Sequence, residues 1–475
     1  MRKTLLSTLL IGLVLGPCVQ ASTAPLTSAP GESALAERVV EGRAFEAAVW
    51  GMPLVNFDAM RQAFLRDGGA AFNDVVYWSK PADWRNQTTT PNHSTLYAMS
   101  FVNLKDGPVV VEIPPASGNG FVGTLIDAWS APMVNVGRTG DDKGQGARYL
   151  LLPPGYKGEV PSQYRGVPSA TLNVQVFLRL IASSKDAQAL ADGVRDIRNV
   201  KVYPLAAAAQ PPASRHIDMA DKLFDGLARF DVSFYQSLAR MVAEEPVQER
   251  DLAIMGQLRS LDIGKGLTFA PDTQRQKVLE RAAQDAHTYL SSGFASAGIP
   301  IWKGQRQWTS VAEPKLTLGT AFSYLQKGQD LRIDERGYSF FGFYGVVVPP
   351  VPQVYLKSFD DARGQRLDGG RQYRLRVPAK VPASQFWAAD VYDPATAGYF
   401  RQSASVGIDS LSDALQKNAD GSVDLYFGAK APSGKQSNWI STEPGKPFFV
   451  MFRFYGPQPA IVDRSWVLND LEALD

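Results

Sequence analysis

Apolar residues near the start of the chain recur at helical spacing. From Ala34 to Trp50 the apolar side chains follow steps of three and four residues and include Leu35, Val39 and Phe45. This spacing places them on one face of an α-helix. We therefore predict an amphipathic helix over residues 34–50 and a second, short helix over residues 54–65.

Beyond these helices the pattern becomes typical of β-strands. Val, Phe, Tyr and Leu gather in short runs that are separated by Gly, Pro or Asn. Many short strands with turns between them favour a β-sandwich. The predicted strands lie at residues 96–104, 108–113, 120–126, 148–152 and 170–180.

The middle of the chain has a helical pattern again. Glycines become rare from about His216 to Ser292, and apolar residues from Met219 to Leu238 recur every three or four positions. This spacing predicts one long helix or two abutting helices. A further helix is predicted from Arg275 to Tyr289, with Asp272 at its start, where aspartate is favoured.

From about Tyr338 the strand pattern returns, with predicted strands at residues 340–348, 373–377, 386–392, 422–427 and 447–455. The whole pattern predicts a mainly β fold with a helical middle segment. We expect an N-terminal part with helices and a β-sandwich over residues 34–210, a small helical domain over residues 211–320, and a second β-sandwich over residues 321–475.

The first 21 residues have the pattern of a signal peptide. Arg2 and Lys3 precede an apolar run, and small side chains stand at Val19 and Ala21, the third and first positions before the expected cut. We predict cleavage after Ala21 and a flexible leader over residues 22–33, so the protein is expected to be periplasmic or secreted. The rival hypothesis is a lipid anchor on Cys18, but Pro17 stands where that processing requires a small residue.

Cleavage changes the composition of the chain. It removes Arg2, Lys3 and Cys18, which leaves basic and acidic side chains equal in number and no cysteine. A neutral chain without basic runs is not expected to bind nucleic acid. Thiolate catalysis and thiolate metal sites are excluded with the cysteine. No later stretch reaches the roughly 20 apolar residues that a membrane span needs.

Several kinds of site are absent from the sequence. The three histidines, His93, His216 and His287, are far apart, and neither a nucleophile-elbow motif nor a phosphate-binding loop occurs. The acids Asp360, Asp361 and Asp368 do not have the spacing of a calcium loop. We therefore expect no metal and no cofactor.

The candidate site consists of polar residues around two predicted strands. Thr90 to Tyr97 places hydrogen-bonding side chains just before a strand, and Asp127-Ala128-Trp129 and Gly137-Arg138 follow. Loops at the ends of rigid strands commonly carry functional groups. The alternative is that the first segment is a self-bonded turn and that Asp127 and Arg138 form a structural ion pair.

These segments, together with others in the far half of the chain, resemble the bacterial exported proteins with tandem domains of unknown function, numbered twelve fifty-four and twelve fourteen. The matching motifs are Asn92 to Tyr97, Asp106 to Pro114, Asp127 to Trp129, Gly137-Arg138, Leu367 to Gly369 with Tyr373, Phe386-Trp387, Tyr392-Asp393, Asp420 to Ser422, Asn438-Trp439 and Arg453 to Pro457. The resemblance implies an N-terminal β-sandwich, a helical segment and a jelly-roll-like C-terminal sandwich. Family members often have an acid where this chain has Ser94.

Two functional hypotheses remain open. In the first, the protein is a hydrolase or lyase that acts on a saccharide or a small polar ester or amide. Asp127 is then the acid or base, Tyr97 or His93 the proton donor, and Arg138 the partner of an anionic group. In the second, the protein binds a small-molecule or saccharide ligand, or an envelope partner, without catalysis. In either case we expect Asn92, Thr95 and Trp129 to bind the ligand, and leave homo-oligomerisation open.

Overall fold

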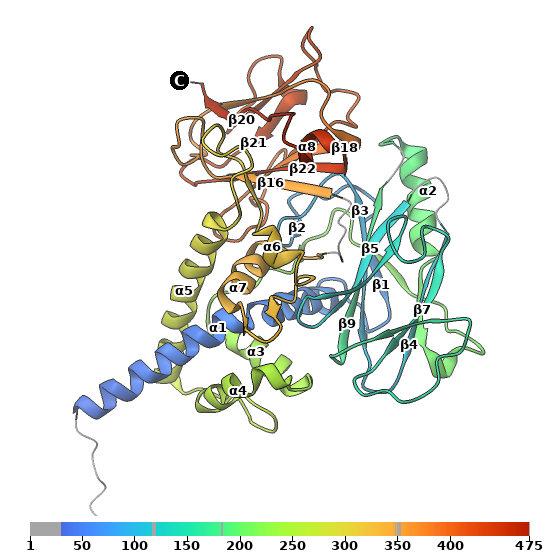
Figure 1. The fold of residues 1–475 in the computed structure, drawn as a ribbon, viewed down its shortest axis with the longest axis vertical. Helices are drawn as coiled ribbons and strands as arrows, with labels where there is room; N and C mark the ends of the chain where they lie inside the picture. The colour runs from blue at the N-terminus through green and yellow to red at the C-terminus, as the bar shows by residue number, and fades with distance from the viewer. Residues whose placement is uncertain (1–29, 116–119, 182–183, 347, 349–352, 475) are drawn as a thin grey trace, which may run out of the picture. The chain divides into compact units, whose positions relative to one another are not determined.

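The computed structural model describes residues 30–115, 120–181, 184–346, 348 and 353–474 (Figure 1). The predicted signal peptide, its cleavage point after Ala21, Cys18 and leader residues 22–29 lie outside the described residues. Two compact units divide the chain after Val39, and the sheets, the site and the pockets described below belong to the second unit, Val40–Asp475.

Helix α1 spans Pro30–Arg66 as one continuous element, whereas the sequence pattern predicted two helices. Pro53 lies inside it. Proline lacks a backbone donor and normally interrupts a helix. Here the turns on both sides of Pro53 are buried, including Trp50 and Phe57, and burial in one core stabilises the helix across the proline.

Two facing sheets follow α1. Five of their strands were predicted from the sequence, at residues 96–104, 108–113, 120–126, 148–152 and 170–180, and the structure confirms them with small shifts at the ends. Side chains of both sheets, such as Leu96 and Tyr149, share one apolar core. The six-stranded sheet has the order β11 (His216–Asp218), β1 (Val75–Tyr77), β3 (Leu96–Asn103), β9 (Asn173–Ile181), β5 (Gly120–Asp127), β6 (Pro132–Gly137). The four-stranded sheet has the order β10 (Lys201–Pro204), β4 (Val109–Ile113), β7 (Ala147–Leu152), β8 (Arg165–Pro168).

The middle of the chain contains helices that pack against α1 from Val40 onward and against one another. Phe234, Leu238, Ala283 and Leu290 share a core with α1, and Figure 1 shows α5 beside α7. These helices are α3 (Val232–Glu244), α4 (Leu252–Leu258), α5 (Thr273–Ser296), α6 (Pro314–Thr317) and α7 (Ile333–Gly342). A further helix, α2 (Ala187–Arg198), packs against β9 instead. The predicted helix from Arg275 to Tyr289 is confirmed as α5, and Asp272 caps it by accepting a bond from the Arg275 amide.

Two predictions for the middle region were wrong. The expected helix from Met219 to Leu238 starts only at Val232, because Met219 and Phe224 are buried next to short strands that pair with other parts of the chain. One of these is β12 (Phe224–Asp225), which pairs with β2 (Asn86–Gln87). Among the described residues of the strand expected over 340–348, residues 340–342 end α7, and residues 343–346 and 348 form no strand.

A second pair of sheets forms the C-terminal part, with Leu356, Leu425 and Phe452 in its shared core. The five-stranded sheet has the order β13 (Thr309–Ser310), β16 (Gln353–Ser358), β22 (Phe449–Pro457), β18 (Ala383–Tyr392), β19 (Gly407–Asp409). The four-stranded sheet has the order β21 (Trp439–Ser441), β20 (Val423–Gly428), β17 (Tyr373–Val377), β23 (Leu471–Ala473). The small elements are β14 (Leu325–Gln326), β15 (Asp330–Leu331) and α8 (Pro459–Val462).

The proportions of helix and strand correct the predicted fold class. About 28% helix and 27% strand make the chain mixed α/β, with several sheets, rather than mainly β. Long helices are the reason, since α1 has 37 residues and α5 has 24. The assignment of each pair of sheets to a β-sandwich, and the boundaries at residues 210 and 320, stay predictions.

Alternation along β22 positions the candidate site. Phe452 and Phe454 point into the core between the C-terminal sheets, whereas Arg453 and Tyr455, which alternate with them, lie on the other face. Tyr355 of β16 pairs with Arg453 and shares that face. One face of the five-stranded sheet therefore carries polar and aromatic groups.

Candidate functional site

The segment from Thr88 to Thr95 joins the N-terminal sheets to the five-stranded sheet. Every residue of it is buried. Its backbone carbonyls accept bonds from the C-terminal part: Arg453 donates to the oxygen of Thr90 at 3.0 Å, and Tyr399 donates to that of Pro91 at 2.9 Å. The polar segment singled out in the sequence is therefore held by the C-terminal part, in addition to bonds within the segment itself.

His93 lies between two carboxylates. Its Nδ1 is 2.6 Å from Oδ1 of Asp390, and its Nε2 is 3.3 Å from Oδ2 of Asp409. Asp390 also accepts a bond from Arg453, and Asp409 one from Lys185. Gly407 leaves room for this contact, because a Cβ there would lie 2.5 Å from Nδ1 of His93 and 2.6 Å from Asp390.

The charges in this cluster support one another. Burial alone lowers the pKa of His93, but Asp390 and Asp409 outweigh it and raise that pKa above its ordinary value. Burial alone raises the pKa of Asp390, but the charges of His93 and Arg453 lower it. Both ring nitrogens of His93 thus hold carboxylates, which makes the imidazolium an ionic clamp and leaves neither nitrogen for a substrate.

Asn92 and Tyr97 belong to a second set of contacts beside the clamp. The amide N–H of Asn92 donates to the Tyr97 hydroxyl at 3.0 Å, and its side-chain Nδ2 donates to the Tyr455 hydroxyl. Oδ1 of Asn92 accepts a bond from the Ser94 amide at 2.7 Å. Ser94 and Thr95 are buried, and their hydroxyls have no hydrogen-bond partner among the described residues.

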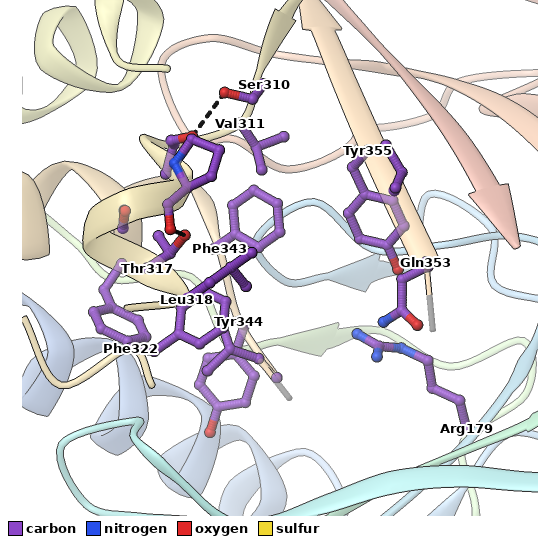
Figure 2. A pocket seen from close by; sticks show the side chains of 17 residues that line it. Arg179, Ser310, Val311, Thr317, Leu318, Phe322, Phe343, Tyr344, Gln353 and Tyr355 are labelled. Atoms are coloured by element: carbon purple, nitrogen blue, oxygen red, sulfur yellow. Dashed lines mark hydrogen bonds between the residues drawn. The ribbon is translucent and has the colours of Figure 1, made fainter. Parts of the chain in front are cut away.

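A pocket of about 180 Å³ opens beside this network. Figure 2 shows its two ends: Val311, Leu318, Phe322 and Phe343 form an apolar wall, and the polar groups of Arg179, Gln353 and Tyr355 lie at the other side. The remaining lining residues are Ser310, Ala312, Pro314, Thr317, Ser339, Phe340, Tyr344, Gly345, Val346 and Val354.

Arg179 is the only charged residue among the described residues that line the pocket. It is 8% exposed, stacks on Phe177 at 4.9 Å and on Tyr97 at 5.7 Å, and forms no ion pair with the described carboxylates. Its Nε has no hydrogen-bond partner in the described part of the chain. Burial opposes its charge, but the phenol oxygens of Tyr97, Tyr355 and Tyr455 raise its pKa, so the guanidinium stays charged.

Asp127 and Trp129 lie elsewhere and do not line this pocket. Oδ1 of Asp127 accepts bonds from the amides of Trp129 and Ala131, both at 2.9 Å. Trp129 packs edge-on against Trp50 at 5.0 Å, and the Arg336 guanidinium lies 4.8 Å from its ring. The structure therefore separates Asp127 and Trp129 from Asn92, His93, Thr95 and Tyr97, which it brings together.

Arg138 is remote from Asp127, so the predicted ion pair between them is not formed. The Arg138 amide bonds to Phe121 at the start of β5, whereas Asp127 ends that strand. Six residues of strand separate the two positions by about 20 Å. Arg138 is exposed and is not part of the pocket.

Asp127 has a raised pKa that makes a stability prediction. Burial raises the pKa to about 6, although the Ala131 and Trp129 amides oppose this. The folded state then binds more protons than the unfolded state between pH 3.8 and about 6, so stability falls as pH rises through this window. We expect D127N to remove this fall and to match or exceed the wild type at pH 7 in urea unfolding.

D127A is the matched control for this prediction. Relative to D127N, it removes the oxygen that two backbone amides bond to, which we expect to cost about 1–3 kcal/mol at pH 4 and at pH 7 alike. If D127N were less stable than the wild type at both pH values, the carboxyl group of Asp127 would stabilise the fold through contacts other than the two amide bonds, and the prediction would be wrong.

The other histidines and the acids considered for a calcium site form hydrogen bonds with backbone groups. His216 bonds to the carbonyls of Ser214 and Val200, and His287 to that of Ala395. Asp361 accepts two backbone amides of its own turn, and Asp368 accepts one. Within the described residues no three His, Cys, Asp or Glu side chains form a group suited to a metal ion.

Sequence reasoning missed Arg179, Tyr355, Asp390 and Asp409. Arg179 interrupts the apolar run Val174 to Ile181 of β9, so a charged residue in a buried strand was the available signal. Asp390 interrupts the apolar run of β18 in the same way, between Ala389 and Val391. Tyr355 has no comparable signal, since a tyrosine in a strand is usually part of a core.

Comparisons with known proteins give a family and a shared fold. The model of DUF1254, described as a protein of unknown function, matches residues 72–204, and that of DUF1214, with the same description, matches residues 352–459. The VPA0106 protein from Vibrio parahaemolyticus is 18% identical, with a TM-score of 0.56 over 92% of this chain and 100% of its own. An uncharacterized protein from Burkholderia cenocepacia is 13% identical, with a TM-score of 0.43 over 94% of this chain and 97% of its own.

No curated protein matches the chain. Within its described residues, no helix has both the length and the apolar run needed to cross a bilayer. The first family model covers the two N-terminal sheets except β11, and the second covers most of the five-stranded sheet with Arg453 and Tyr455. The chain therefore belongs to the family of proteins with tandem DUF1254 and DUF1214 domains, as the motifs had indicated.

Proposed function

We propose that this protein is exported and binds a small molecule with an apolar body and an anionic head in the pocket beside Arg179. The observation that carries the proposal is a buried arginine, without a carboxylate partner among the described residues, at the side of an apolar pocket. A buried charge is costly unless it is paired, so a guanidinium in this position favours an anionic ligand.

The volume of the pocket limits the size of the apolar body. A protein cavity of about 150 Å³ accommodates benzene. The pocket of about 180 Å³ therefore suits one aromatic ring or a chain of roughly six to eight carbons. Its walls of Phe, Leu and Val favour such a group over a saccharide, whose hydroxyls need hydrogen-bond partners on several sides.

This proposal belongs to the hypothesis of ligand binding without catalysis. The rival hydrolase or lyase hypothesis relies on Asp127, His93 or Tyr97. His93 has both nitrogens engaged, and Asp127 lies away from the pocket with an oxygen that two backbone amides hold. The raised pKa of Asp127 is the one observation that favours acid–base chemistry.

The test uses residues 22–475 with octanoate and 4-phenylbutyrate as probes, measured by calorimetric titration and thermal unfolding. We expect one site per chain and a rise of a few degrees in Tm when the probe exceeds its Kd about 100-fold. Absence of both effects with both probes would contradict the proposal.

Leu318 offers a variant that tests the location of the site. It lines the apolar wall and is 41% exposed, so L318E is expected to fold normally and to weaken octanoate binding at least about tenfold, because the new carboxylate repels the anion. L252E is the matched control, since Leu252 is 61% exposed on α4 and does not line the pocket. Equal affinities of the two variants would place the ligand elsewhere.

A further inference from the structure

We infer that the Tyr355 hydroxyl donates a hydrogen bond to the head of the ligand, and that the ligand is therefore a carboxylic acid rather than an alcohol or an amine. Asn92 makes Tyr355 a donor toward the pocket, because Asn92 bonds to Tyr455 and Tyr455 bonds to Tyr355. The inference rests on the proposed function, and it assigns a role to the polar segment of the sequence that the pocket itself does not include.

The first step is the orientation of the Asn92 amide. Oδ1 accepts the Ser94 amide N–H at 2.7 Å, and only an oxygen accepts such a bond. Nδ2 therefore faces Tyr455 and donates to its hydroxyl oxygen. The hydrogen bond from the Ser94 amide therefore orients the Asn92 side chain so that its Nδ2, and not its Oδ1, contacts the Tyr455 hydroxyl.

The second step is the direction of the bond between the two tyrosines. The Tyr455 hydroxyl is buried, since the residue is 3% exposed, and it is 3.1 Å from the Tyr355 hydroxyl. Its oxygen already accepts from Asn92, and its own proton needs an acceptor because a buried donor without one is costly. The Tyr355 oxygen is the acceptor at hand, so Tyr455 donates to Tyr355.

The third step is what Tyr355 presents to the pocket. A hydroxyl that accepts from Tyr455 keeps its own O–H as a donor, and Tyr355 lines the pocket with its hydroxyl on the same side as the Arg179 guanidinium (Figure 2). Two donors, one of them charged, favour a head group with two acceptor oxygens and no proton of its own. A carboxylate meets that requirement, whereas an ammonium group has only donors.

The relative affinity for octanoate and 1-octanol tests the inference, because a structural change would move both affinities together. We expect Y355F to lower the octanoate-to-octanol preference about tenfold, the loss of one hydrogen bond to a charged group. Tyr455 does not line the pocket. We expect Y455F to lower the same preference by a smaller factor, because the Tyr355 hydroxyl then no longer accepts a bond from Tyr455 that would keep its own proton pointing toward the ligand.

Y344F is the matched control. Tyr344 also lines the pocket, but its hydroxyl donates to Gln175, so the preference should stay unchanged. Unchanged preferences in Y355F and Y455F, with tight octanoate binding by the wild type, would overturn the inference and leave the proposed function standing. Binding of neither octanoate nor 4-phenylbutyrate by the wild type would overturn both.

Discussion

Replacing Arg179 by methionine is expected to weaken octanoate binding about 10- to 100-fold. A hydrogen bond to a charged group contributes about 1.5–3 kcal/mol, and each 1.4 kcal/mol corresponds to a factor of ten in Kd. Methionine keeps an unbranched side chain of similar length, so the apolar volume of the pocket changes little. Calorimetric titration of the wild type and R179M measures the effect directly.

The same variant is expected to leave the free protein as stable as the wild type or to stabilise it. Arg179 is 8% exposed, contacts aromatic rings and forms no ion pair within the described residues, so its charge is buried without a compensating carboxylate. An apolar side chain removes that desolvation cost. Loss of binding together with unchanged or higher stability distinguishes a functional arginine from a structural one.

R366M is the matched control for R179M. Arg366 also lies over an aromatic ring, at 5.6 Å from Phe359, but its side chain is 64% exposed and pairs with Asp360 outside the pocket. We expect octanoate affinity in R366M to equal that of the wild type. If R179M bound octanoate as tightly as R366M, the anionic head would not be held by Arg179.

The sequence predicted those strands and helices well whose formation depends on residues within the element or next to it. The strand over residues 373–377 and the helix over residues 275–289 depend on apolar spacing and on a capping aspartate, and both are confirmed. The helix expected from Met219 failed because burial in short paired strands produces a similar spacing of apolar residues. Spacing alone does not distinguish these cases.

The candidate site was predicted only in part, for a reason that concerns distance along the chain. Asn92, His93 and Tyr97 were selected as neighbours in sequence, and they do lie together. Their partners Asp390 and Tyr455 are about 300 residues or more away, and nothing in local spacing connects them. Arg453 likewise stands in an apolar strand, and its partner Asp390 lies in a different strand that local spacing does not connect to it.

The charged cluster around Asp390 gives the second large expected effect. D390N is expected to destabilise the protein by about 3–5 kcal/mol, because it removes the shared partner of two buried cations, His93 and Arg453. Chemical unfolding at pH 6 measures this loss. The control is E472Q, which breaks the Arg374 pair at 2.7 Å, and in which both side chains are at least 35% exposed, so we expect less than about 1 kcal/mol.

The pH dependence of stability tests whether the destabilisation expected in D390N arises from the ion pair between Asp390 and His93. Its pKa is raised on folding, so its stabilising contribution is complete below pH 6.5 and is lost as pH rises through the higher folded value. The pKa of Asp390 is lowered, so its contribution is complete above pH 3.8 and is lost as pH falls through the lower folded value. The wild type should therefore gain most from the clamp between these two limits. In D390N, His93 keeps only Asp409, so its folded pKa should be lower, and the decline above pH 6.5 should be smaller and should end at lower pH. A parallel shift of the whole profile, with no change in that decline, would mean that Asp390 acts on Arg453 and the backbone of the Thr90 segment rather than on His93.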